Sequence, residues 1–157
     1  MADRYSAYLE LLDALRKNLS TLCQLAGEKT AAVRNDNLLA LDSVMRKEQA
    51  LSLSFRGLEQ KKDALARELQ LDSVPLSSLP DHFPAHMQIQ AKKSVEALQD
   101  QYKIYRSAAE VARNTLECNL HEIEKFLAAQ DASAPAGPGY EPSPAEPPEA
   151  MKSDFRA

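Results

Sequence analysis

A regular alternation of three- and four-residue steps between apolar side chains opens the sequence, and it restricts the chain to helix packed against helix. The positions are Tyr5, Tyr8, Leu12, Leu15, Leu19, Leu22 and Ala26. A spacing that averages about 3.5 residues keeps one stripe of an α-helix facing its neighbours as the helices supercoil. Because the same rhythm returns in two later segments, the sequence predicts an all-α fold built from long helices.

Breaks in this rhythm divide the chain into three predicted helices, at about residues 3–33, 37–71 and 85–129. A polar turn at residues 34–37 ends the first helix, and a connector with three prolines, residues 72–84, ends the second. Each proline removes a backbone donor and biases the residue before it away from helix. Because the first turn is short, the second helix should run back along the first. Residues 1–130 are therefore expected to form a three-helix antiparallel, coiled-coil-like bundle.

The second and third helices carry less regular seams than the first. In the second, the seam is Leu38, Leu41, Met45, Leu51, Phe55, Leu58, Leu65 and Leu69, interrupted by Glu48 and Lys62. In the third, it is Ala91, Val95, Leu98, Tyr102, Tyr105, Ala109, Ala112, Leu116, Ile123 and Phe126. Asn119 falls on this register, and the adjacent Leu120 can take its place. We expect Leu15, Leu58 and Leu98 to lie in the core.

The composition changes at residue 131. Six of the nine prolines and two of the four glycines lie in residues 131–157, whose only large apolar side chains are Tyr140, Met151 and Phe155. Such a segment buries too little apolar area to offset the entropy lost on ordering. The sequence predicts a disordered, acidic, proline-rich tail.

The third predicted helix is longer than the other two. At about 1.5 Å per residue it would span about 65 Å, against roughly 45–52 Å for the first two. If it starts level with the end of the second helix, its last turns project past the turn near Asn35. An apolar stripe of Leu116, Leu120, Ile123, Phe126 and Leu127 would then lack a partner, as binding surfaces often do. Alternatively, the helix starts late or the connector covers that end.

Charge and hydropathy exclude several classes of function. A net charge of −4 and a pI near 5.4 argue against non-specific nucleic-acid binding, which needs clustered Lys and Arg. No apolar stretch approaches the ~18 residues that a membrane span requires, so no membrane insertion is expected. The first residues lack the layout of a secretory signal, so we expect a cytoplasmic protein. Cys23 and Cys118 should then be reduced, packed thiols.

Candidate catalytic and metal-binding residues are few. His82 and His86 have the spacing of a helical metal pair, but Pro84 lies between them and His121 is far along the third helix. Glu48 could become a general acid if buried, or it could pair with Lys47 or a residue of the third helix and fix the register. No nucleophile, base or oxyanion donor accompanies it. We expect neither an enzyme nor a metal or cofactor site.

Several segments resemble the flagellar type III export chaperones of the FlgN type. They are residues 28–33 (EKTAAV), 35–37 (NDN), 38–41 (LLAL), 47–51 (KEQAL), 58–62 (LEQKK) and 117–119 (ECN), with Ile123 and Phe126 downstream. The resemblance covers most of residues 1–130 and rests mainly on helical periodicity. One departure concerns two asparagines found three apart in several relatives, where this chain has Tyr105 and Ala108.

The resemblance implies a cytoplasmic chaperone that binds hook-filament junction proteins, which are hook-associated proteins, before their export. The cargo helix would pack on the end of the third helix and on the tail. The implied contact residues are Leu116, Leu120, Ile123, Phe126, Leu127 and Tyr140. Relatives also dock on the membrane export gate through a tail tyrosine, for which Tyr140 is the one counterpart, although its Gly-Tyr-Glu context differs.

The residues alone leave two functions open. In the first, the chain is a monomer or weak homodimer whose free stripe binds an amphipathic cargo helix and keeps the cargo soluble and export-competent. In the second, the chain is a self-associating structural coiled coil whose stripe pairs with another copy.

Overall fold

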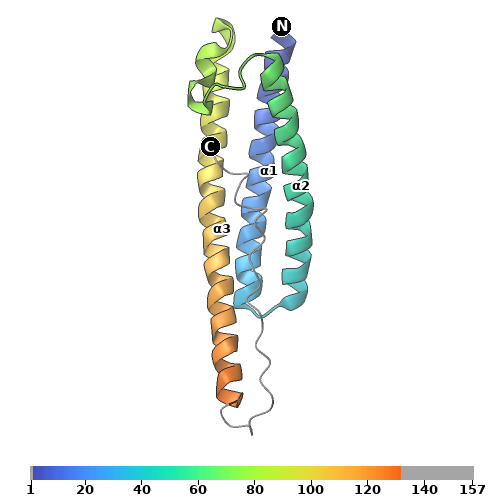
Figure 1. Cartoon of the computed structure of the whole chain (residues 1–157), viewed down its shortest axis with the longest axis vertical. Helices are drawn as coiled ribbons and strands as arrows, with labels where there is room; N and C mark the ends of the chain where they lie inside the picture. The colour runs from blue at the N-terminus through green and yellow to red at the C-terminus, as the bar shows by residue number, and fades with distance from the viewer. Residues whose placement is uncertain (1, 132–157) are drawn as a thin grey trace. The chain divides into compact units, whose positions relative to one another are not determined.

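Long helices make up the described part of the chain, which is residues 2–131 of a computed structural model. The elements are α1 (Ala2–Arg34), α2 (Leu38–Glu68), the 3-10 segments η1 (Leu76–His82) and η2 (Ala85–Met87), and α3 (Gln88–Asp131) (Figure 1). No strand occurs between residues 2 and 131. The predicted all-α class is therefore confirmed for these residues, while the tail predicted beyond Asp131 lies outside them.

The first helix ends in a closed hydrogen-bonded cap without glycine. Asp36 adopts a left-handed conformation with φ of 51°. Its N–H donates to the carbonyl of Val33 at 3.2 Å, and the N–H of Asn37 donates to the carbonyl of Ala32 at 2.9 Å. This pair of bonds is the Schellman arrangement, which satisfies carbonyls that a helix end would leave free. The polar turn predicted at residues 34–37 is thus present, and these two hydrogen bonds are what ends α1 there.

The second helix begins and ends with its own caps. The side-chain oxygen of Asn37 accepts from the N–H of Ala40 at 3.1 Å, as an N-cap does. At the other end Gln70 has φ of 61°, and the N–H of Leu71 donates to the carbonyl of Ala66 at 2.7 Å. This second Schellman end stops α2 at Glu68, three residues before the predicted end.

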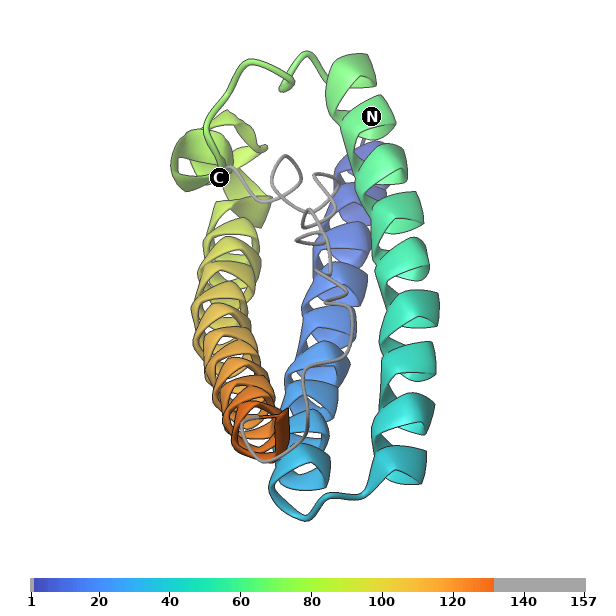
Figure 2. The same cartoon turned by 60° about the horizontal axis from the view of Figure 1, so that its bottom comes forward.

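α1 and α2 lie side by side along their length, and the chain reverses direction between them (Figures 1 and 2). The predicted seam of α1 is buried from Tyr8 onward. The exposed fractions are 2% for Tyr8, 0% for Leu12, 2% for Leu15, 1% for Leu19, 4% for Leu22 and 2% for Ala26. Tyr5 is half-buried against the same core. A heptad stripe that has neighbours on both sides stays buried, as the pattern predicts.

The seam predicted for α2 was wrong at two positions. Leu38 is 77% exposed and Met45 is 44% exposed, whereas the adjacent Val44 is 6% exposed. The stripe that lies against the core follows a strict three-four alternation through Leu41, Val44, Glu48, Leu51, Phe55, Leu58, Lys62, Leu65 and Leu69. The predicted seam leaves this register at Met45, because it treats Glu48 and Lys62 as interruptions although both belong to the stripe.

The proline-containing connector forms part of the core. Within η1 and the residues after it, Leu79 and Phe83 are 3% and 4% exposed. The Phe83 ring meets Tyr5 and Tyr8 of α1 edge-on, with ring centroids 5.0 and 6.0 Å apart. Such edge-to-face pairs add to the area that the aromatic rings bury. The short 3-10 segment η2 follows, and α3 begins at Gln88, three residues later than predicted.

The first part of α3, as far as Tyr105, contributes to the same core, and a further buried position follows at Ala112. Ala91, Val95 and Leu98 are 0%, 3% and 8% exposed, and Ala112 is 2% exposed. Tyr102 and Tyr105 are half-buried and pack against this cluster. Of the three leucines predicted to be core, Leu15 and Leu98 are buried and Leu58 is half-buried against the cluster.

Candidate protein-binding surface

The last turns of α3 present large apolar side chains to solvent. Four of them form what we call the distal stripe: Leu120, Ile123, Phe126 and Leu127, which are 56%, 48%, 63% and 51% exposed. They recur at steps of three and four on one helix, so they share one face. A helical face of this kind fits a helix or groove of complementary shape.

The distal stripe continues the core seam of α3 without a change of register. Steps of three and four lead from Ala112 through Leu116 and Asn119 to Ile123 and Phe126. Ala112 is buried and Leu116 and Asn119 are half-buried, whereas Ile123 and Phe126 are exposed. Leu120, expected to substitute for Asn119 on the seam, is the more exposed of those two residues. The same apolar pattern thus changes from covered to uncovered along a single helix.

Five of the six residues implied as partner contacts lie on this one helix. Leu116 is half-buried, and the four residues of the distal stripe are exposed. Tyr140 lies outside the described residues. The expectation that the last turns of α3 lack a partner within the monomer stays a prediction.

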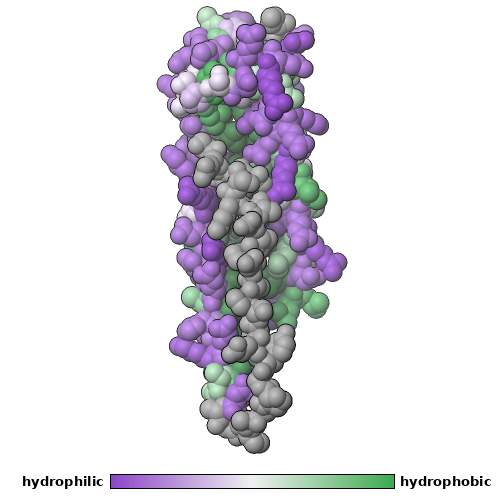
Figure 3. Space-filling model, in the orientation of Figure 1, coloured by the Kyte–Doolittle hydropathy of each residue, from purple (hydrophilic) through white to green (hydrophobic). Residues whose placement is uncertain are grey.

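A second exposed apolar pair lies at the start of α2 and was missed from the sequence. Leu38 and Leu39 are 77% and 86% exposed, directly after the Asn37 cap. A seam with steps of three and four never includes two consecutive residues. The sequence alone therefore indicated that at least one of these leucines is off the seam. The remaining exposed apolar side chains, such as Leu53 and Ile89, are scattered. The face drawn in Figure 3 accordingly mixes hydrophobic and hydrophilic residues.

A largely buried ion pair joins α1 and α2, in addition to the exposed pair of Arg4 with Glu68. The Nζ of Lys29 lies 2.8 Å from the Oε2 of Glu48, and the two side chains are 19% and 21% exposed. The sequence suggested Lys47 or a residue of α3 as the partner of Glu48, and this expectation was wrong. A pair at this position fixes the register of α2 on α1, as polar seam residues do in coiled coils.

The tyrosines of α3 lie beside this polar part of the seam. Burial raises the pKa of Tyr105, and the nearby Glu48 carboxylate raises it further. Burial likewise raises the pKa of Tyr102. Both hydroxyls therefore stay protonated at neutral pH, which suits seam residues with polar ends better than proton-transfer groups.

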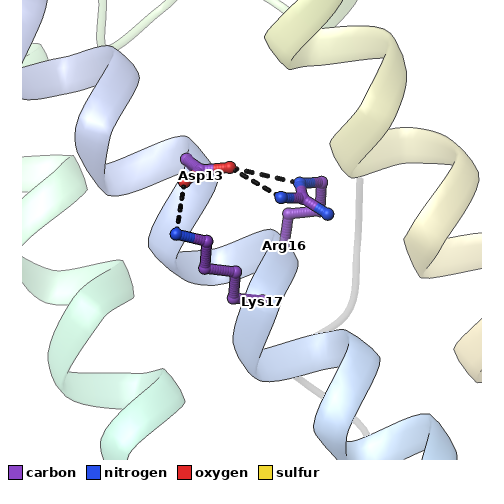
Figure 4. A network of polar contacts seen from close by, with 3 residues as sticks. All are labelled: Asp13, Arg16 and Lys17. Carbon is purple, nitrogen blue, oxygen red and sulfur yellow. Dashed lines mark hydrogen bonds and ion pairs between the residues drawn. The ribbon is translucent and has the colours of Figure 1, made fainter.

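A local cluster on α1 contains Asp13, Arg16 and Lys17 (Figure 4). The Asp13 carboxylate accepts from Arg16 at 2.8 Å and lies 3.1 Å from the Lys17 ammonium. Hydrogen bonds from Arg16 and Lys17 hold the pKa of Asp13 below its usual value. All three residues lie within about one turn on the partly exposed side of α1, so the cluster supports the helix and resembles no catalytic arrangement.

Other polar groups offer little chemistry. In the described range 2–131, no group of three or more His, Cys, Asp or Glu side chains is placed to hold a metal ion. Cys23 is a half-buried free thiol and Cys118 an exposed one. Asn18, only 8% exposed, has a side-chain oxygen without a hydrogen-bond partner in this part of the chain.

None of the helices described is long and apolar enough to cross a bilayer.

Comparison with known proteins adds no relative. No family model, no curated protein and no solved structure matches the chain.

Proposed function

We propose that the chain is a chaperone that binds a helix of a protein cargo on the distal stripe, and that it belongs with the FlgN-type export chaperones. One observation carries the proposal: the α3 seam keeps its register while its residues pass from buried Ala112, 2% exposed, to Phe126, 63% exposed. An apolar pattern maintained without cover is typical of a surface that is covered by a partner.

The mechanism is physical and needs no bond to be made or broken. An amphipathic helix of the cargo lies along the stripe and shields its own apolar face from aggregation. Full burial of a large apolar side chain is worth about 1.5–3 kcal/mol, so covering the exposed half of four such chains gives roughly 3–6 kcal/mol. This moderate energy, offset in part by ordering costs, suits a complex that an export machine must take apart.

The proposed scaffold is an antiparallel three-helix bundle in the cytoplasm, with the tail after Asp131 as a second contact for cargo. The cargo class is the hook-filament junction proteins, and Tyr140 is the proposed contact with the membrane export gate. The resemblance of residues 28–33 and 47–51 to the chaperone family supports these assignments.

Calorimetric titration with a hook-filament junction protein tests the proposal. The double variant Leu120→Ser and Ile123→Ser should weaken binding by at least tenfold, because it removes roughly 2 kcal/mol of apolar contact. Its thermal unfolding should resemble that of the parent, since both side chains are already half exposed.

The matched control is Leu38→Ser with Leu39→Ser, which removes two even more exposed leucines from the start of α2. This control should bind cargo like the parent. Unchanged affinity in the α3 variant would remove the distal stripe from the binding site, and loss of its cooperative melt would identify the stripe as ordinary core.

Self-association is the second candidate, because a second helix in a coiled coil also packs against an unbroken heptad register. Analytical ultracentrifugation of the parent distinguishes the two. A dimer that persists on dilution and is abolished by the α3 variant supports the structural coiled coil, whereas a monomer leaves the stripe free for cargo.

A further inference from the structure

The flanks of the distal stripe are acidic. Glu122 and Glu124 lie among its residues, are exposed, and form no ion pair within the described part of the chain. Lys125 is the one Lys or Arg between residues 120 and 131, and Asp131 adds a further negative charge. An occupant of this face should therefore combine apolar anchors with positive charge.

The last residues of the chain have this combination. After Lys125, the only basic residues in the sequence are Lys152 and Arg156. They stand directly beside Met151 and Phe155, and each pair has a spacing of four. In a helical turn, residues four apart lie on the same side, so the two apolar groups and the two cations would occupy neighbouring sides.

The intervening chain is long enough to bring this segment to the stripe. Residues 132–150 include six prolines. A proline-rich chain extends by about 3.1 Å per residue, so these residues can span up to roughly 60 Å. The distance back along α3 from Asp131 to Leu120 is only about 16 Å at the helical rise. Length therefore does not restrict the contact.

The size of the stripe favours a tethered occupant over a second copy. Four side chains that are each about half exposed offer roughly 400 Å², taking about 150–250 Å² for a large side chain. A long-lived homodimer needs about 800 Å² from each copy, whereas a transient complex such as the one proposed for cargo can be smaller. A segment of the same chain needs far less, because a short tether supplies an effective concentration of the order of millimolar.

We propose that residues 151–156 dock on the distal stripe of their own chain, with Met151 and Phe155 against the leucines and Lys152 and Arg156 beside Glu122 and Glu124. The segment covers the apolar face when no partner is present. If the proposed chaperone function holds, the segment also competes with cargo for the same surface. The regulatory meaning rests on that function, whereas the docking itself does not.

Hydrogen–deuterium exchange of the full-length chain, without cargo, tests the docking. Amides of residues 120–127 should exchange about twofold faster after Met151→Ser with Phe155→Ser, because a tethered ligand whose effective concentration equals its millimolar dissociation constant gives protection of this size. Amides of the α1 core should not change. Tyr140→Ser is the matched control, since it removes a large tail side chain that has no cation beside it.

Charge reversal provides the second arm. Lys152→Glu with Arg156→Glu should speed exchange of the same amides, and adding Glu122→Lys with Glu124→Lys should restore the slow rate. The proposal fails if exchange is the same in the parent and the Met151/Phe155 variant, or if Tyr140→Ser has an equal effect. It also fails if protection fades on dilution, which would identify a second copy as the occupant. Because no cargo is present, these outcomes are independent of the cargo titration.

Discussion

The Lys29–Glu48 pair offers a quantitative test of how α1 and α2 are held in register. The perturbations are Lys29→Met, Glu48→Leu and the two together, which keep the side-chain bulk and remove the charges. The atoms are 2.8 Å apart and each side chain is about one fifth exposed, so both charges are largely withdrawn from water. A hydrogen bond between charged groups contributes about 1.5–3 kcal/mol.

Each single variant should therefore lose about 2 kcal/mol of unfolding free energy, because it leaves the other charge half-buried and unpaired. The double variant should lose no more than either single one, since two well-packed apolar groups can replace a buried pair. The resulting coupling energy is about 2 kcal/mol. Urea unfolding followed by circular dichroism measures it, provided that the slope with denaturant stays constant.

The exposed pair Arg46–Asp42 is the matched control within α2. Its atoms are 3.1 Å apart, but the side chains are 78% and 63% exposed. Solvent screening should reduce its coupling to about 0.5 kcal/mol or less. If the coupling of Lys29 with Glu48 is no larger than that of the control, the pair does not fix the register and the reasoning is refuted.

Three further predictions concern single positions. Gly57→Ala should stabilise the chain by about 1 kcal/mol, because α2 gains a better helix former and nothing lies within 4 Å of the added carbon; a lower urea midpoint would contradict this. Gln70→Gly should raise the unfolding free energy by about 1 kcal/mol, because glycine adopts the left-handed conformation at the end of α2 without strain. The same urea unfolding assay measures this, and a loss of stability would show that the Gln70 side chain contributes more than its backbone costs. Burial of Tyr8, with the Asp63 carboxylate nearby, raises its pKa from 10.0 to about 12, so its contribution to stability is complete below pH 10 and is lost as pH rises to about 12. The loss amounts to about 3 kcal/mol, and Tyr8→Phe should remove this alkaline decline from the urea midpoint plotted against pH; an unchanged decline would place its origin elsewhere.

Periodicity predicted α1 well and α2 less well, for a physical reason. In α1 every seam position is apolar, so the register can be read directly from side-chain type. In α2 the stripe passes through Glu48 and Lys62, which are tolerated there because both stay partly exposed and each lies close to an opposite charge. Knowing that Glu48 meets Lys29 requires the relative position of two helices, which one helix's pattern does not contain.

Helix ends were predicted to within a few residues, and the connector was not. The turn after α1 was recognisable from its cap-forming side chains, but the left-handed Gln70 carries no signal in its residue type. Prolines correctly indicated a break between Asp72 and Pro84, yet they hid the fact that Leu79 and Phe83 are core residues. Breaks in a helical pattern show where a helix stops and say little about what the connecting residues pack against.

The candidate site was readable from the sequence because it depends on one helix. Ile123 and Phe126 follow the α3 seam at its regular steps of three and four residues, so their positions on it can be predicted from this helix alone. They are exposed when no other segment packs over this face. Leu38 was predicted to lie on the α2 seam, yet it is 77% exposed, because an apolar side chain alone does not indicate burial. Only the packed positions of the neighbouring residues distinguish a seam leucine from a surface one.

The contacts of Phe83 with Tyr5 and Tyr8 have a consequence for the order of events during synthesis. The two tyrosines leave the ribosome before α2, and their partner ring follows only after both α1 and α2 have been made. Until then the α1–α2 hairpin has an unfinished end with two aromatic rings uncovered. Contacts between residues so distant in the chain form late and slow the completion of folding. The nascent chain thus passes through a stage in which it needs protection of the kind that we propose it gives to others.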